Sequence, residues 1–260
     1  MTPPFTDVWK PADGRKFGLM GHVVGCYPTK EAAKEILGIM VDAGVDVIEI
    51  QIPFSEPMAD GPLFMQANQE ALDKGVTVAD SFELMAQFAK QQSTSRFVFM
   101  TYLNIAFQYG YEAFVKDAVA AGAAGVIVPD LPVEYSGELD SACDKHKFAN
   151  IRLVTPNMSP SRLKLLGKAA KGMVYAVARA GVTGKATHFG EDLAQFLDRV
   201  RQSTAIPIGV GFGVRGPEDV RFLKDKADYA IIGTQALRVY QKGGAAALQE
   251  FWASLKDAAQ

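Results

Sequence analysis

The sequence has few of the residues from which disulfide frameworks and metal sites are built. Its 260 residues include two cysteines, Cys26 and Cys143, and three histidines, His22, His146 and His188. The cysteines are far apart in the sequence, and neither residue type shows the clustered spacing of metal ligands. We therefore expect no metal ion and a reducing compartment, the cytoplasm.

An excess of positive charge and a long apolar run are also missing. Lys and Arg total 27 against 29 Asp and Glu, which gives a net charge of −2 and disfavours binding to nucleic acid. No apolar run approaches the ~20 residues of a membrane-spanning helix, and the polar, proline-containing N-terminus is unlike a signal peptide. With 48% hydrophobic residues the chain can bury a full core. These features predict a globular protein that binds neither nucleic acid nor a membrane.

Short β-branched runs alternate with longer amphipathic stretches along the chain. Eight runs are predicted as strands, at residues 19–24, 47–51, 97–102, 125–128, 151–154, 173–177, 207–210 and 229–232. Helical patterns lie at residues 31–42, 63–72, 81–91, 111–121, 135–147, 161–170, 192–202, 217–224 and 245–256. This α/β alternation predicts a single (β/α)8 TIM barrel over residues 1–260, with extra short helices.

Glycine-bearing segments follow three of the late strands, at residues 181–184, 211–213 and 233–234. Glycine lets backbone N–H groups approach an anion closely, and a helix N-terminus adds a favourable dipole. Loops at the carboxyl ends of the last barrel strands often bind phosphate. We therefore expect a phosphorylated ligand, although the same glycines would also serve simply to turn the chain.

Glu49 is an ionisable residue in an otherwise apolar strand, VIEIQ. Because strand side chains alternate, Glu49 shares a face with Val47 and Gln51, and we expect that face to point into the barrel. Desolvation there would raise its pKa and suit it to proton transfer. A purely structural carboxylate is the alternative. Asp60 is a weaker candidate by itself, because Asp-Gly is a common turn.

Other reaction classes lack their residues. None of the eight predicted strands contains a lysine for a Schiff base. The chain has no Ser-His-Asp motif of nucleophile-elbow form and no opening Rossmann glycine motif. A pairing of His22 with Glu49 across adjacent strands is conceivable, but it is not a metal site by itself. What is left is cofactor-free acid/base chemistry on a phosphorylated substrate.

The segment at residues 49–62, EIQIPFSEPMADGP, resembles the signature segment of the tryptophan synthase α subunit family. Further family-like segments follow in order: MTYLN at 100–104, VPDLP at 128–132, RAGVTG at 179–184, GVGFG at 209–213 and IIGT at 231–234. The resemblance covers almost the whole chain. It implies a TIM barrel that cleaves indole-3-glycerol phosphate to indole and glyceraldehyde 3-phosphate. It also implies no cofactor on this chain and a pyridoxal-phosphate-dependent β subunit as partner in a heterotetramer.

The resemblance also implies roles for individual residues. Glu49 would be the general acid/base that protonates the indole C3 carbon, and Asp60 the carboxylate that interacts with the indole N–H. Tyr175 would lie near the glycerol part, and Thr183 would help to position Asp60. The other substrate-binding positions are Gly184, Gly213, Gly233 and Thr234 at the phosphate, and His22, Met100, Tyr102, Ile127 and Phe212 around the indole ring.

Several positions depart from the family pattern. Residues 22–28 read HVVGCYP, where the family usually has an aromatic-apolar-Thr run followed by Ala-Gly-Asp-Pro, so a histidine lines the pocket and Tyr27 precedes the proline. Gln51 replaces a glycine, Glu56 an aspartate and Thr234 a serine. Two interpretations stay open: a lyase, either β-paired or stand-alone, and a binding or allosteric paralogue with little turnover. Retention of both carboxylates favours the lyase.

Overall fold

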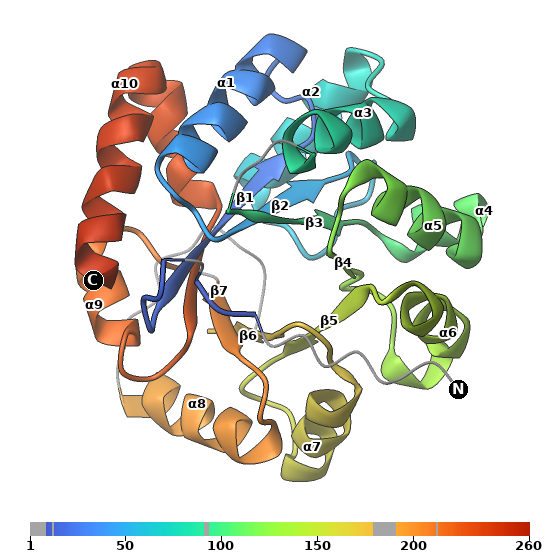
Figure 1. Cartoon of the computed structure of the whole chain (residues 1–260), viewed down its shortest axis with the longest axis vertical. Coiled ribbons are helices and arrows are strands. Elements are labelled where there is room, and N and C mark those ends of the chain that lie inside the picture. Colours follow the sequence, from blue (N-terminus) through green and yellow to red (C-terminus); the bar gives the residue numbers. More distant parts are fainter. Residues whose placement is uncertain (1–8, 12, 91–93, 179–190, 212) are drawn as a thin grey trace.

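Eight parallel strands close into a barrel inside a ring of helices (Figure 1). This computed structural model describes residues 9–11, 13–90, 94–178, 191–211 and 213–260. Each strand pairs with the next one in the chain, and the last pairs with the first. The predicted (β/α)8 barrel is confirmed.

The strands are β1 (Gly18–Val24), β2 (Val47–Gln51), β3 (Arg96–Met100), β4 (Gly125–Ile127), β5 (Ala149–Val154), β6 (Val174–Val177), β7 (Ile208–Gly211) and β8 (Tyr229–Ile232). The helices are α1 (Lys30–Asp42), α2 (Pro62–Asp73), α3 (Val78–Ala89), α4 (Leu103–Tyr109), α5 (Tyr111–Ala121), η1 (Val133–Tyr135, a 3-10 turn), α6 (Gly137–His146), α7 (Pro160–Ala169), α8 (Glu191–Ser203), α9 (Pro217–Leu223) and α10 (Thr234–Ala259).

Side chains along each strand alternate between the barrel interior and the layer beneath the helices. In β2, Val47 belongs to the interior apolar cluster, whereas Ile48 and Ile50 belong to the cluster between barrel and helices. Glu49 and Gln51 share the parity of Val47 and therefore face the interior. The orientation expected for Glu49 from the sequence is thus the observed one.

Some boundaries differ from those predicted. Strand β3 ends at Met100, and the next two residues lead into α4, a helix of only 7 residues that the sequence pattern does not reveal. A helix this short shows too little of the helical period to be recognised. The helix predicted over residues 135–147 is α6, which begins only at Gly137, and Tyr135 is instead the last residue of η1. Helix α10 begins at Thr234, well before the predicted residue 245, and bends where Gly244 has a φ of 64°.

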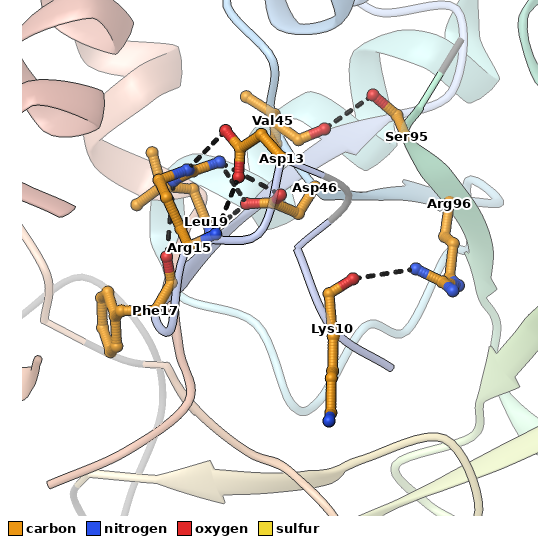
Figure 2. Close-up of polar contacts among 9 residues, drawn as sticks. All are labelled: Lys10, Asp13, Arg15, Phe17, Leu19, Val45, Asp46, Ser95 and Arg96. Atoms are coloured by element: carbon orange, nitrogen blue, oxygen red, sulfur yellow. Dashed lines mark hydrogen bonds and ion pairs between the residues drawn. The ribbon is translucent and has the colours of Figure 1, made fainter. Parts of the chain in front are cut away.

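A polar network ties the segment before β1 to the amino-terminal ends of the first strands (Figure 2). The Asp46 carboxylate accepts hydrogen bonds from the Leu19 backbone N–H at 2.8 Å and from the Arg15 guanidinium at 3.1 Å. Arg96, the first residue of β3, donates to the Lys10 carbonyl at 3.2 Å. The chain entering the barrel is thereby fixed across its amino-terminal end.

Trp9 fills the barrel interior at this same end. Its side chain is 1% exposed and packs with the interior cluster. It lies so close to Gly172 that a Cβ there would come within 3.0 Å of the indole ring, and the φ of 78° at Gly172 also favours glycine. A filled amino-terminal end leaves the carboxyl ends of the strands for chemistry, as barrels of this type use them.

Within the described ranges, no helix is both long and apolar enough to cross a membrane.

Candidate active site

Glu49 lies inside the barrel near the carboxyl end of β2, with 2% of its surface exposed. Its partner in the register of β1 is His22, whose Nε2 is 3.7 Å from Glu49 Oε1. Glu49 Oε2 is buried and has no hydrogen-bond partner in the described part of the chain. Burial, and the nearby charge of Asp60, raise the pKa of Glu49 well above its ordinary value. Glu49 therefore keeps a proton at pH values where an exposed glutamate has lost it.

Asp60 reaches the same place from the loop between β2 and α2. The residue is 3% exposed, and its Oδ2 accepts hydrogen bonds from Gln51 Nε2 at 2.6 Å and from the Tyr102 hydroxyl at 3.2 Å. Burial raises the pKa of Asp60 to about 6, and the two donors oppose that rise. At neutral pH Asp60 is mainly a carboxylate. The two acidic side chains thus lie together but favour different protonation states.

Gln51, two residues after Glu49, connects Asp60 to β1 and to α2. Its Oε1 lies 2.9 Å from His22 Nε2, and its Nε2 also donates to Asn68 Oδ1 at 3.3 Å. Burial lowers the pKa of His22 to about 4, so the imidazole is neutral. The Asp60 carboxylate can only accept hydrogen bonds, so the amide nitrogen of Gln51 faces it. The amide oxygen of Gln51 then faces His22, which therefore carries its proton on Nε2.

Asn68 is a functional-site residue that the sequence patterns miss. It is fully buried on the inner face of α2, where it accepts from the Phe54 backbone N–H at 3.0 Å and donates to the Phe64 carbonyl at 2.8 Å. These bonds join the loop that carries Asp60 to a helix. The one signal in the sequence is an asparagine within the apolar stripe of an amphipathic helix.

Tyr102 holds the other side of the Asp60 loop. Its hydroxyl accepts from the Ala59 N–H at 3.1 Å while donating to Asp60, and its ring stacks on Phe54 with centroids 5.0 Å apart. Tyr102 is fully buried, and burial together with the charge of Asp60 raises its pKa. The predicted site residue Tyr102 therefore contacts the predicted site residue Asp60 directly.

Tyr175 projects from β6 into the interior beside the two carboxyl groups. Burial and the charges of Glu49 and Asp60 raise its pKa well above the ordinary value. Its hydroxyl passes so close to Gly211 of β7 that a Cβ there would lie 2.3 Å from it. Glycine at position 211 is therefore what lets the tyrosine ring cross to the neighbouring strand.

Met100 and Ile127 provide the apolar wall of this end of the barrel. They are the last residues of β3 and β4, neighbours in register, and both are buried in the interior cluster with Tyr102 and Tyr175. Phe54 of the Asp60 loop packs against the same cluster. The carboxyl groups of Glu49 and Asp60 and this apolar wall thus face the same space inside the barrel.

Glycines lie where the last two strands end. Gly213, with a φ of 120°, follows β7, and Gly233 follows β8 and precedes the first residue of α10, Thr234. A Cβ at Gly233 would approach the His22 ring to 3.3 Å. The first N–H groups of a helix have no partner within it and point outward from its end, which suits an anion. Three further predicted residues, Thr183, Gly184 and Phe212, lie outside the described residues.

No group of three or more His, Cys, Asp or Glu side chains suited to a metal ion occurs among the residues the structure describes. His22 and Glu49 do lie side by side, but the ring nitrogen that faces Glu49 is the one bonded to Gln51.

The family model described as tryptophan synthase alpha chain matches residues 11–259. The chain belongs to the tryptophan synthase alpha chain family.

Members of that family resemble the chain over nearly their whole length. The tryptophan synthase alpha chain of Syntrophotalea carbinolica is 45% identical over 238 residues, covering 92% of this chain and 94% of that one. The alpha chain of Desulfotalea psychrophila is 43% identical, with 92% and 93% covered. Among solved structures, tryptophan synthase of Mycobacterium tuberculosis matches with a TM-score of 0.88 at 32% identity, covering 94% of this chain and 93% of that chain.

Proposed function

We propose that this chain is the α subunit of tryptophan synthase and cleaves indole-3-glycerol phosphate to indole and glyceraldehyde 3-phosphate. The observation that supports this best is the pair Glu49 and Asp60, two buried carboxyl groups at the carboxyl end of a barrel whose pKa values are raised to different extents. Of two adjacent acids that favour different protonation states, one can transfer the proton while the other supplies a fixed negative charge.

Glu49 is the proton donor in this scheme. Cleavage of the bond between indole C3 and the glycerol side chain requires a proton on C3, which Glu49 donates. The hydroxyl on the attached carbon then gives its proton to the Glu49 carboxylate as the carbon–carbon bond breaks and the aldehyde forms, so that Glu49 is protonated again. Glu49 keeps its proton because it is desolvated, and its Oε2 has no partner within the described structure to compete for it. His22 and Tyr175 close the space around it.

Asp60 supplies the negative charge. Protonation at C3 places a positive charge on the indole ring, and a carboxylate at the ring N–H stabilises that charge most when water is excluded. Gln51 and Tyr102 keep Asp60 ionised in this dry site. The indole ring is assigned to the apolar wall that Met100 and Ile127 provide.

The substrate phosphate is assigned to the ends of β7 and β8, where Gly213, Gly233 and Thr234 present backbone N–H groups and the start of α10. Thr183, Gly184 and Phe212 complete the proposed substrate site, as the family resemblance implies. Tyr175, between the carboxyl groups and β7, is assigned to the glycerol part.

A tryptophan synthase β subunit is the partner. Large apolar side chains stand exposed in three consecutive connections at the active-site end: Met58 after β2, Phe107 in α4 after β3, and Tyr135 in η1 after β4, at 72%, 63% and 79% exposure. Apolar groups gathered at one rim mark an interaction surface. We propose an assembly of two α and two β subunits.

The remaining assignments follow from the same scheme. Proton transfer by two carboxyl groups needs no cofactor on this chain, and pyridoxal phosphate would belong to the β subunit. We assign the chain to one domain, residues 1–260, since the described strands form a single closed barrel. Cys26 and Cys143 are unpaired, which suits the cytoplasm.

Turnover of indole-3-glycerol phosphate by the purified protein, alone and with its own organism's β subunit, tests the proposal. Indole and glyceraldehyde 3-phosphate should form in equal amounts, faster in the presence of the β subunit. High activity alone without association would indicate a stand-alone lyase. Absence of both products in either condition would reject the lyase function and favour a binding paralogue.

A further inference from the structure

The proton-transfer scheme gives no task to two polar side chains of the site, the fully buried Gln51 and the mostly buried His22. We infer that Gln51 is a positioning residue that holds Asp60 ionised and oriented, and that His22 fixes the orientation of the Gln51 amide. The effect on turnover rests on the proposed function, whereas the effect on Asp60 itself does not.

The first argument is the completeness of the Gln51 hydrogen bonding. Its amide makes three bonds, one from His22, one to Asp60 at 2.6 Å and one to Asn68 at 3.3 Å. A fully buried amide that uses its oxygen and both N–H groups has one orientation only, since rotation would place its oxygen against the Asp60 carboxylate. The amide therefore presents a donor to Asp60 at all times.

The second argument is that Asp60 needs donors. Burial disfavours its charge, while Gln51 and Tyr102 favour it by donating to the same oxygen, Oδ2. The described titratable groups around this carboxyl are Glu49 on β2, Tyr102 after β3, Tyr175 on β6 and His22 on β1. None of these carries a positive charge at neutral pH, so hydrogen bonds provide the local stabilisation of the carboxylate.

The third argument is geometric. Asp60 lies on a loop, and loop positions are less precise than positions on strands and helices. Gln51 connects this loop to β1 through His22 and to α2 through Asn68, and the His22 ring stacks on Phe64 of α2 with centroids 4.4 Å apart. Three regular elements thus fix one carboxylate oxygen.

The test reads the Asp60 carboxyl directly. Carbon-13 NMR of the full chain, with the Asp60 signal assigned by its loss in Asp60→Asn, gives the pH midpoint of that group in each variant. Gln51→Leu keeps the side-chain volume and removes the donor, so the Asp60 midpoint should rise by about one to two units. At pH 7, kcat for indole formation should fall about tenfold while the acid limb of the pH–rate profile moves upward.

His22→Phe is the second variant, because Gln51→Leu leaves His22 Nε2 without its hydrogen-bond partner and its folding is not assured. Phenylalanine preserves stacking on Phe64 and removes the donor to Gln51, so the midpoint should again rise, by a smaller amount. Gln69→Leu is the matched control: Gln69 donates to Asp73 at 2.7 Å on the exposed side of α2, and its loss should leave the Asp60 midpoint and turnover unchanged.

An Asp60 midpoint that does not move in a folded Gln51→Leu or His22→Phe protein would overturn the inference, whatever the turnover. If the wild-type protein released no indole but the Asp60 midpoint rose in the two variants, the lyase function would be rejected and the role of Gln51 would be retained.

Discussion

Glu49 and Asp60 show how environment separates the behaviour of two similar side chains. Both are almost fully buried, yet Asp60 receives two hydrogen bonds and the described structure offers none to Glu49 Oε2. Hydrogen bonds to the charged form offset desolvation, and their absence leaves desolvation unopposed. Asp60 therefore has two donors that favour its ionised form, whereas both desolvation and the charge of Asp60 disfavour the ionised form of Glu49.

Replacement of Glu49 tests the proton-transfer role. Glu49→Gln removes the ionisable group at constant size, so kcat should fall by roughly 10²-fold or more while affinity for glyceraldehyde 3-phosphate stays within about twofold. Steady-state kinetics and ligand titration measure the two quantities. Retention of most of the turnover would reject the assignment, and loss of the folded state would instead indicate a structural carboxylate.

Replacement of Asp60 tests the cost of holding a charge in the site. Its folded-state pKa of about 6 exceeds the ordinary 3.8, so the native state binds the proton more tightly and Asp60 lowers stability as pH rises from about 4 to 6. Asp60→Asn should therefore raise the unfolding free energy at pH 7 by up to about 3 kcal/mol while abolishing turnover.

Urea unfolding at pH 4 and at pH 7 checks this, because the gain should shrink as pH falls through the window. An equal effect at both pH values would mean that a neutral contact, and not the charge, decides the stability of the variant.

Alternation predicts that Glu49 points inward, but no local pattern predicts what Gln51 does. Its partners come from β1, from the loop at Asp60 and from α2, at sequence separations of 29, 9 and 17 residues. A polar residue at a strand end looks the same whether it faces solvent or completes a network. Only closure of the barrel brings these partners together.

At the scale of elements, the parallel strands could be predicted because both of their faces are buried. Runs such as VYAV and YAII are continuous in apolar residues, which distinguishes them from amphipathic helices. Helix α4 escaped prediction because it is short and its N-cap, Tyr102, provides no side-chain capping bond. Capping residues mark α1 and α3, where Thr29 and Thr77 accept hydrogen bonds from the first turn.

The contact between β6 and β7 at the active site depends on one glycine. In Gly211→Ala, the new Cβ would meet the Tyr175 hydroxyl at 2.3 Å, so either the ring or the strand must shift. We expect the free energy of unfolding to fall by about 1–3 kcal/mol and kcat to fall with it. Thermal unfolding and steady-state kinetics measure both.

Gly38→Ala is the matched control for this change. Gly38 lies within α1, and a Cβ there meets nothing within 4 Å. Alanine should stabilise the helix by about 0.5–1 kcal/mol without altering kcat. If Gly211→Ala were as harmless as Gly38→Ala, the close approach of Tyr175 would not constrain the strand.

At the scale of the whole molecule, the two ends of the barrel differ in what they do. Trp9 and the hydrogen bonds of Asp46 close the amino-terminal end, so that end contributes stability. The carboxyl end carries Glu49 on β2 and Asp60 on a loop held by side-chain hydrogen bonds, and exposed apolar side chains stand on three of the connections at this end. A partner that covers this rim also acts on the loop, since Met58 lies two residues before Asp60.

Association with the β subunit can be tested away from the catalytic groups. Phe107 and Tyr135 are exposed at the rim and contact none of the proposed catalytic side chains, whereas Leu165, 46% exposed on α7, lies in the outer ring. An aromatic anchor at an interface is worth about 2 kcal/mol or more, so Phe107→Asp and Tyr135→Asp should each weaken β binding by roughly 30-fold. Leu165→Asp should leave the affinity for the β subunit unchanged.

Without the β subunit the kcat of all three variants should equal that of the wild type, and saturating β subunit should restore full activation in the two rim variants. Calorimetric titration and indole release measured across β concentrations decide the outcome, and equal weakening by Leu165→Asp would place the interface elsewhere.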